Sequence, residues 1–216
     1  MKLGNDVVIS VDGKAVNGDL TLKKGSPGLV LFAYGSGSSR FSPRQRFVAE
    51  RLNGAGFSTL FMDLLTPEEE VLDEVTREYR FDIPLLAGRL ESAMRWAKQE
   101  ERTKDLPLGL TGGSTGAAAC LIAAARRASM VKAVVSRGGR TDLADWYLPD
   151  VTAATLFIVG GEDEEVLELN RDSYKKLKCG FKELEIVPGA THLFEEPGKM
   201  DKVAELTVDW FRKYLV

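Results

Sequence analysis

The sequence predicts an α/β protein with a mostly parallel sheet, helices on both faces and an antiparallel N-terminal edge. From residue 28 onward, apolar runs typical of buried strands alternate with amphipathic helical patterns. The run at 28–34 is apolar almost throughout, as expected of a strand covered on both faces. Before it, alternating segments at 7–11 and 20–22, separated by Asp12-Gly13 and Asn17-Gly18, predict antiparallel strands joined by tight turns.

Local signals place the elements that follow. Ser42-Pro43 supplies an N-cap and a first helical residue for a helix ending near residue 53. Thr66-Pro67-Glu68-Glu69 forms a capping box that opens a short acidic helix. The remaining patterns predict strands at 58–64, 108–111, 131–136, 155–159 and 184–187, and helices at about 66–77, 84–99, 117–127, 164–178 and 199–214.

Length and composition indicate one globular domain over residues 1–216. With 44% apolar and 28% charged residues, the 216-residue chain can bury a full core. The only insertion large enough to act as a lid is about 65–81, and its acidic run is expected to be a solvated helix face. The net charge of −3, with acids and bases interspersed, does not indicate a nucleic-acid partner.

The chain carries no signal that directs it to a membrane or an oxidising compartment. Residues 1–6 lack the apolar core of a signal peptide, and no apolar stretch reaches membrane-spanning length. Cys120 and Cys179 are too few for a disulfide framework and are expected to be ordinary thiols. We therefore expect a soluble cytoplasmic protein with no membrane partner.

A Gly-x-Ser-x-Gly motif lies between a strand pattern and a helix pattern. Leu108–Thr111 leads into Gly112, Ser114 and Gly116, and an alanine-rich run follows. In so sharp a turn a side chain at either flanking position would collide with the neighbouring strand or helix, so glycine is required. The turn lifts the Ser114 hydroxyl clear of the sheet beside the N-terminus of a helix.

Three residues that together activate a hydroxyl follow the carboxyl ends of different strands. In chain order they are Ser114, Asp163 and His192. An imidazole must take the serine proton, and a carboxylate must fix the tautomer of that imidazole. His192 is the only histidine, so it is the only candidate base.

The acid and the oxyanion donors have alternatives. Asp163 has acidic neighbours on both sides, but its distance from the strand end favours it, whereas the two glutamates after it suit the first turn of a helix. The backbone N–H groups of Thr115 and Ser36 are the expected oxyanion-hole donors. The loop that holds Ser36, Gly35-Ser36-Gly37, would otherwise be interpreted as a flexible turn.

Several side chains are candidates for the substrate pocket. Arg40, Arg137 and Arg140 could meet a substrate carboxylate, although such arginines more often tie loops together. Trp146 and Tyr147 could line the pocket or pack a loop.

Five segments resemble the dienelactone hydrolase-like α/β-hydrolases. They are Leu31–Arg40, Phe61–Glu69, Gly112–Ala119, Gly160–Asp163 and Gly189–Phe194. The resemblance implies the α/β-hydrolase fold, with Ser114 as nucleophile, Asp163 as acid and His192 as base. The chain departs from that family in two ways: serine replaces the cysteine nucleophile, and Tyr34 stands where histidine is usual.

These observations predict a serine hydrolase that cleaves small carboxylic esters or lactones through an acyl-serine intermediate. An acyltransferase or thioesterase using the same triad is an alternative. A non-catalytic or engineered hydrolase-like scaffold is another, if Tyr34 alters the oxyanion loop or blocks the pocket. Tyr34 could instead line the pocket or add a hydroxyl donor. No metal or organic cofactor is implied, the expected partner is a small-molecule ester or lactone, and the sequence does not indicate an oligomeric state.

Overall fold

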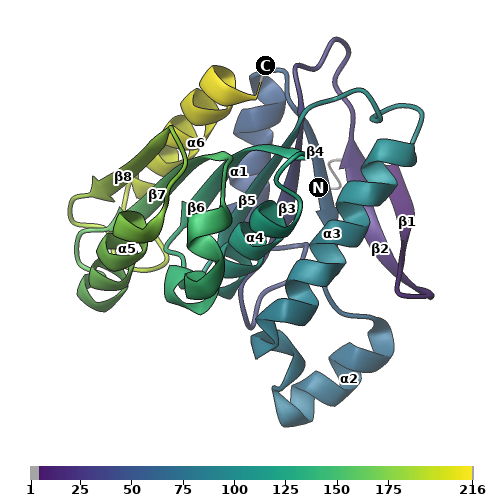
Figure 1. The fold of residues 1–216 in the computed structure, drawn as a ribbon, viewed down its shortest axis with the longest axis horizontal. Helices are drawn as coiled ribbons and strands as arrows, with labels where there is room; N and C mark the ends of the chain where they lie inside the picture. Colours follow the sequence, from purple (N-terminus) through teal and green to yellow (C-terminus); the bar gives the residue numbers. More distant parts are fainter. Residues whose placement is uncertain (1–4, 216) are drawn as a thin grey trace.

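The computed structural model describes residues 5–215, so the first four residues of the N-terminal stretch considered above lie outside it. Eight strands form one sheet in the order β1-β2-β4-β3-β5-β6-β7-β8 (Figure 1). The strands are β1 Asn5–Val11, β2 Lys14–Thr21, β3 Leu29–Ala33, β4 Ser58–Met62, β5 Leu108–Gly113, β6 Val131–Arg137, β7 Ala154–Gly160 and β8 Lys182–Val187.

The pairing confirms the predicted fold class. Strands β4, β3, β5, β6, β7 and β8 pair in parallel, while β1 and β2 form an antiparallel edge that joins β4. Because the central strands run in one direction, their carboxyl ends lie along one edge of the sheet. Ligand-binding residues of such sheets gather at that edge.

One expected turn is wrong. Asn17-Gly18 lies inside β2, where Gly18 pairs with both Val7 and Met62. A Cβ at Gly18 would stand 2.7 Å from the carbonyl oxygen of Phe61, so the glycine allows close approach of a neighbouring strand. Only Asp12-Gly13 makes a hairpin turn, with φ values of 49° and 78°.

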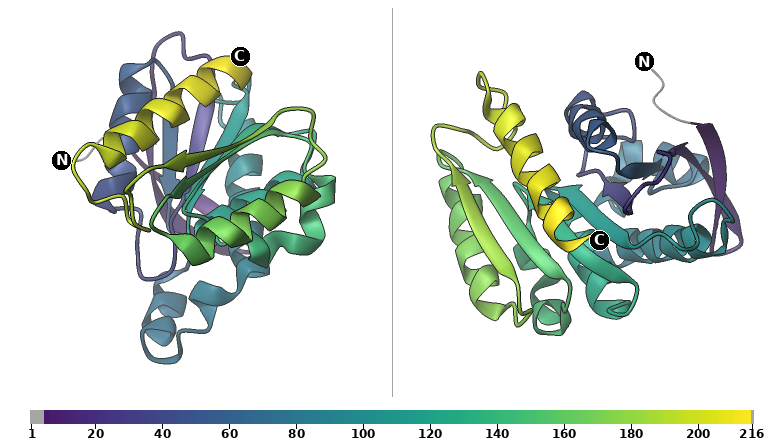
Figure 2. Two further views of the ribbon diagram at one scale, coloured as in Figure 1. Left: turned by 90° about the vertical axis from the view of Figure 1, so that its left-hand side faces the viewer. Right: turned by 90° about the horizontal axis from the view of Figure 1, so that it is seen from above.

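Helices cover the sheet on both faces (Figure 2). Helices α1 and α6 pack on one face, and α3, α4 and α5 on the other. This double cover explains why every residue of β3, β4, β5 and β7 is buried. The helices are α1 Pro43–Gly54, α2 Pro67–Thr76, α3 Ile83–Gln99, α4 Thr115–Arg126, α5 Glu164–Lys176 and α6 Lys199–Tyr214, with 3₁₀ segments η1 Tyr79–Phe81 and η2 Thr141–Asp150.

The insertion between β4 and α3 contains α2 and η1, and it projects from the body of the sheet (Figure 1). The predicted capping box is confirmed at its start. The Glu69 N–H donates to the Thr66 hydroxyl at 3.3 Å, and the Thr66 N–H donates to the Glu69 carboxylate at 2.9 Å. We call residues 65–81 the lid.

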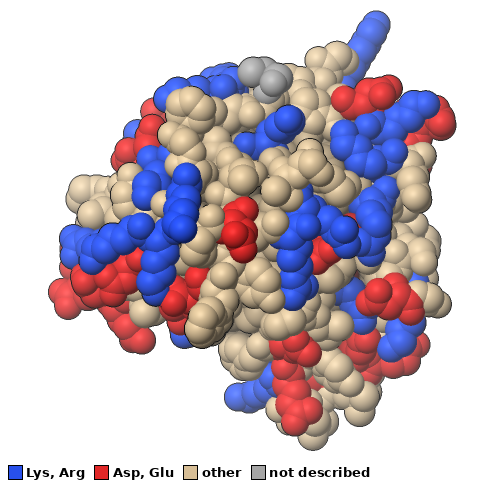
Figure 3. All heavy atoms as spheres, viewed as in Figure 1, with Lys and Arg blue, Asp and Glu red and all other residues tan. Residues whose placement is uncertain are grey.

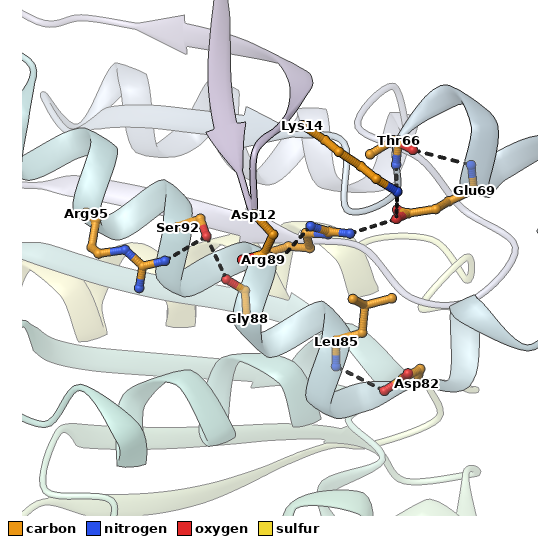
Figure 4. A network of polar contacts seen from close by, with 10 residues as sticks. All are labelled: Asp12, Lys14, Thr66, Glu69, Asp82, Leu85, Gly88, Arg89, Ser92 and Arg95. Atoms are coloured by element: carbon orange, nitrogen blue, oxygen red, sulfur yellow. Dashed lines mark hydrogen bonds and ion pairs between the residues drawn. The ribbon is translucent and has the colours of Figure 1, made fainter.

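An ionic network centred on the buried Arg89 and Glu69 side chains fastens the base of the lid to the rest of the fold (Figure 4). The Arg89 guanidinium, from α3, contacts the carboxylates of Glu69 and Asp12 at 2.8 Å each, and the Lys14 ammonium lies 3.1 Å from Glu69. Burial opposes ionisation of Glu69, but the Thr66 N–H, Lys14 and Arg89 outweigh it and hold the pKa of Glu69 below its ordinary value. The network joins lid, helix and N-terminal hairpin.

The surface carries mixed charge, with basic and acidic side chains interspersed on the face drawn in Figure 3. Among residues 5–215, no helix combines the length and the apolar character that a membrane crossing requires. Cys120 and Cys179 are both buried and unpaired with each other.

Candidate active site

Ser114 lies on a strained turn between β5 and α4. Its φ of 50° and ψ of −124° place a non-glycine residue in a sparsely populated region of backbone conformation. A Cβ at Gly112 would stand 2.6 Å from the backbone of Gly116, and a Cβ at Gly116 would stand 2.5 Å from the Ala33 carbonyl oxygen. The flanking glycines are therefore required by close backbone packing, as the motif predicts.

His192 and Asp163 meet at the carboxyl edge of the sheet. Asp163 follows β7 and His192 follows β8, and Asp163 Oδ2 lies 2.7 Å from His192 Nδ1. The carboxylate side chain is 14% exposed and the imidazole 37% exposed. A carboxylate on Nδ1 keeps the proton on that nitrogen, which leaves Nε2 as an acceptor. Of the four adjacent acidic residues at 162–165, Asp163 is the one that the structure brings to the ring.

Ser114 and His192 line one cavity of about 210 Å³. In the part of the chain that the structure describes, no hydrogen bond joins the Ser114 hydroxyl to the ring. Nucleophile–base hydrogen bonds are often long in the absence of substrate and tighten when it binds. The two groups thus line the same cavity, and the hydrogen bond that the ring makes within residues 5–215 is at Nδ1.

Neighbouring segments hold the imidazole loop in place. The ring packs over Gly138, where an added Cβ would stand 3.5 Å from both Nδ1 and Cε1. The Thr191 N–H donates to the Glu196 carboxylate at 3.0 Å, and Arg44 on α1 pairs with Glu195 at 2.8 Å. These contacts fix the loop on both sides of His192.

The two expected oxyanion donors differ in their surroundings. Thr115 is the first residue of α4, so its N–H has no acceptor within the helix. The Ser36 N–H instead donates to the Thr115 hydroxyl at 2.8 Å. The loop is packed tightly here, because a Cβ at Gly35 would stand 2.9 Å from Ser114 Cβ.

Tyr34 does not direct its hydroxyl toward the nucleophile. The hydroxyl accepts a hydrogen bond of 2.7 Å from the Leu64 N–H, and burial raises its pKa well above the ordinary value. Tyr34 lines a second cavity of about 400 Å³ beside the lid, which shares Gly35, Ser36 and Ser38 with the Ser114 cavity. Tyr34 therefore anchors the loop at its first residue.

The three candidate arginines have separate environments. Arg137 lines the Ser114 cavity and pairs with no carboxylate among residues 5–215, and burial, followed by the charge of Arg44, lowers its pKa to about 10. It remains charged at neutral pH. Arg40 pairs with Asp63 at 3.3 Å and lines a groove between the β1–β2 hairpin and α1. Arg140 forms two hydrogen bonds, of 2.8 and 2.9 Å, with Asp142.

The structure does not bring the candidate aromatic residues to the nucleophile. Trp146 is 94% exposed on η2, a segment that the strand and helix patterns did not predict. The Tyr147 hydroxyl accepts a hydrogen bond of 3.0 Å from Arg126. Trp146 therefore lies on the surface, whereas Tyr147 is half-buried and packs against the apolar core.

Sequence reasoning missed several residues of the cavity. Ser38, Ser42, Arg44 and Gln45 line it together with Arg137. The available signal was position, because the first turn of α1 follows β3 and must therefore start at the carboxyl edge of the sheet. The cavity is consequently more polar and more basic than the motifs alone indicated.

Comparisons with known proteins agree with this architecture. The sequence profile of the Dienelactone hydrolase family matches residues 18–215. A dienelactone hydrolase from Anabaena variabilis has a crystal structure with a TM-score of 0.96 and 51% sequence identity, covering 98% of both chains. Est1E from Butyrivibrio proteoclasticus has a TM-score of 0.82 at 17% identity, covering 97% of this chain and 98% of its own, which shows the fold alone.

Two curated relatives are not named as hydrolases. Both are proteins of Mycobacterium tuberculosis named putative phosphoribosyl transferase, from strains CDC 1551 and H37Rv, and each is 54% identical over 202 residues. The match covers 93% of this chain but only 44% of each relative, so the chain spans less than half of their length. The profile match over 18–215 and the fold shared with the Anabaena enzyme show that this chain is a hydrolase-fold protein belonging to the dienelactone hydrolase family.

Proposed function

We propose that the chain is a serine hydrolase that cleaves small carboxylic esters or lactones through an acyl-Ser114 intermediate. The observation that carries the proposal is the 2.7 Å contact between Asp163 Oδ2 and His192 Nδ1, on a ring that lines the same cavity as Ser114. A hydroxyl, an imidazole and a carboxylate in that relation form the arrangement that turns serine into a nucleophile at neutral pH.

The proposed reaction has two halves. The Nε2 atom of His192 takes the proton of the Ser114 hydroxyl as the oxygen attacks the carbonyl carbon, and the carbonyl electrons move onto oxygen. When they return, the bond to the alcohol oxygen breaks and the imidazolium donates its proton to that oxygen. Water then attacks the acyl carbon as the same nitrogen takes its proton, and the imidazolium returns that proton to the Ser114 oxygen as the acid is released.

The cavity favours a small acyl group that carries a negative charge. Its volume of about 210 Å³ suits a small acyl group, since a cavity of roughly 150 Å³ already holds a benzene-sized molecule. Arg137 presents a guanidinium that pairs with no carboxylate among residues 5–215. Arg44 lines the same cavity and adds a second positive charge. Guanidinium groups bind carboxylates and phosphates through paired hydrogen bonds. We propose Arg137 as the residue that selects acid-bearing esters or lactones.

Other activities fit the same residues less directly. The name phosphoribosyl transferase belongs to relatives of which this chain covers 44%, whereas the profile match of the chain is to a hydrolase family. Acyl transfer and thioester hydrolysis would use the same acyl-serine. A non-catalytic scaffold is disfavoured, because Tyr34 lines the cavity beside the lid and its hydroxyl is bonded to Leu64.

A panel of p-nitrophenyl esters and lactones, with and without an acid group on the acyl part, tests the proposal. Hydrolysis by the wild-type protein should fall to background in Ser114→Ala and persist in Ser10→Ala, a change on the exposed surface of β1. Added alcohol distinguishes transfer from hydrolysis by the formation of a new ester, and a thioester of the same acyl group distinguishes the thioesterase. No turnover in any arm, from folded wild-type protein, would favour the scaffold.

A further inference from the structure

The side chain of Thr115 makes an unusual contact beside the nucleophile. Its hydroxyl accepts the Ser36 N–H at 2.8 Å, although that N–H is the group expected to face the substrate oxygen. A hydroxyl has one proton to donate and two lone pairs with which to accept. Thr115 is only 3% exposed, and among residues 5–215 its hydroxyl proton has no acceptor. A buried donor that is left unpaired destabilises the fold, so an unused proton at this position calls for a partner.

The loop that holds Ser36 is restrained at both ends. At its start, the Tyr34 hydroxyl is bonded to the Leu64 N–H. At its end, Arg40 pairs with Asp63 at 3.3 Å, and the Arg40 carbonyl accepts a hydrogen bond of 2.8 Å from Arg46. Directly before Ser36, Gly35 has no room for a Cβ against Ser114. The Ser36 N–H is thus held on the Thr115 oxygen.

The position of Thr115 suits a second role. Its backbone N–H, at the start of α4, is the donor that a carbonyl oxygen bound to Ser114 would meet first. The hydroxyl of the same residue accepts the Ser36 N–H at 2.8 Å, and that N–H is the loop donor that would otherwise reach the substrate oxygen. Because the hydroxyl oxygen already accepts from Ser36, its proton is free to point at a third group.

We propose that the Thr115 hydroxyl, oriented by the Ser36 N–H, is a catalytic residue that donates the second hydrogen bond of the oxyanion hole. The proton stays on Thr115 throughout, and the hydrogen bond strengthens as negative charge develops on the carbonyl oxygen. A hydroxyl that accepts from an N–H is itself a better donor, because linked hydrogen bonds polarise one another. This inference rests on the proposed serine hydrolase function.

Two variants of Thr115 give opposite expectations. Thr115→Val has nearly the same shape without the hydroxyl, and we expect kcat to fall by about 10²–10³, the usual effect of losing one oxyanion donor, with KM little changed. Thr115→Ser keeps the hydroxyl and should retain kcat within a few-fold. If the Thr115 hydroxyl only blocks the Ser36 N–H, Thr115→Val would free that donor, and kcat would stay the same or rise. That result overturns the inference.

Two controls separate a failed inference from a failed function. Urea unfolding of both variants shows whether a loss of kcat reflects a disturbed fold, and the rate at which an organophosphonate labels Ser114 gives a second readout of the hole, since the phosphoryl oxygen occupies it. Slowed labelling in Thr115→Val but not in Thr115→Ser supports the hydroxyl. If the wild type shows activity that depends on Ser114 and Thr115→Val is as active as the wild type, the proposed role of the Thr115 hydroxyl is wrong but the serine hydrolase function stands. Absence of Ser114-dependent activity in the wild type removes both.

Discussion

The Tyr34 hydroxyl accepts a hydrogen bond of 2.7 Å from the Leu64 N–H. Tyr34 begins the loop that carries Ser36, and Leu64 precedes the lid, so a single bond joins the two segments. The Arg40–Asp63 ion pair joins the same segments a second time. The loop that carries Ser36 and the residues directly before the lid are therefore held together by two contacts. A substitution in one segment is expected to alter the position of the other.

Replacing Tyr34 by phenylalanine should loosen this connection. The variant leaves the Leu64 N–H without its acceptor, and the free energy of unfolding should fall by about 1–3 kcal/mol, the cost of an unpaired buried donor. Urea denaturation measures the change. Tyr79→Phe is the matched control, because the Tyr79 hydroxyl makes no hydrogen bond within residues 5–215. Equal stabilities of the two variants would show that the Tyr34 hydroxyl anchors nothing.

Asp163→Asn should show that Asp163, and not an adjacent acidic residue, is the acid that acts on His192. An amide cannot hold the proton on Nδ1 of His192 in the same way, and loss of the correct tautomer costs roughly 10⁴ in kcat in serine triads. Esterase assays at saturating substrate measure the loss of kcat, and circular dichroism verifies that the variant is folded. Glu162→Gln, a change to an exposed neighbour, should leave kcat unaltered. A larger loss in Glu162→Gln than in Asp163→Asn would reassign the acid.

Arg137→Gln should change specificity more than rate. Removing the guanidinium takes away a charge-assisted contact worth about 1.5–3 kcal/mol, so kcat/KM for an acid-bearing ester should fall by roughly 10- to 100-fold. The uncharged ester of the same size should be nearly unaffected. Arg140→Gln is the control, since Arg140 is already paired with Asp142. Equal losses for both esters would assign Arg137 to the structure of the site and not to substrate selection.

The Asp63 carboxyl should make stability depend on pH. Burial raises its pKa to about 6, against the opposing charge of Arg40. The folded state therefore binds this proton more tightly than the unfolded state, in which an aspartate titrates near about 4. The contribution of Asp63 to the free energy of unfolding is thus highest at low pH and falls as pH rises from about 4 to about 6.

Asp63→Asn removes that dependence. Relative to wild type, the variant should gain up to about 3 kcal/mol at pH 8, from a shift of roughly two pKa units at about 1.4 kcal/mol each, and gain nothing near pH 4. Urea unfolding at both pH values measures the difference. A variant that is less stable than wild type at pH 8 would mean that the ion pair with Arg40 outweighs the cost of burying the carboxylate.

The parts of the fold that follow from periodicity were predictable. Helix α6 begins and ends where its apolar stripe predicts, and the capping box at Thr66 starts α2. The turn expected at Asn17-Gly18 was wrong because a glycine can serve close approach between strands as well as a turn, and only the pairing of β2 with β4 distinguishes the two. Segment η2 was missed because 3₁₀ turns leave no strong hydrophobic period.

In the candidate active site, too, some features could be predicted from the sequence and others could not. Strand order places Ser114, Asp163 and His192 along one edge, so their grouping could be inferred from chain position. The partners of individual long side chains could not. Arg40 and Arg137 look equivalent in sequence, yet Arg40 has Asp63 within 3.3 Å and Arg137 has no carboxylate partner in the described part of the chain. Such pairings depend on contacts between segments far apart along the chain, which local patterns do not encode.

Covalent labelling by an alkyl fluorophosphonate, followed by intact-protein and peptide mass spectrometry, tests the central claim most directly. The account predicts one adduct per chain on Ser114, absent from Ser114→Ala and formed at least about 100-fold more slowly in His192→Ala, since the imidazole is the base that activates the hydroxyl. Folded wild-type protein that takes up no adduct, or an adduct that persists in Ser114→Ala, would contradict it.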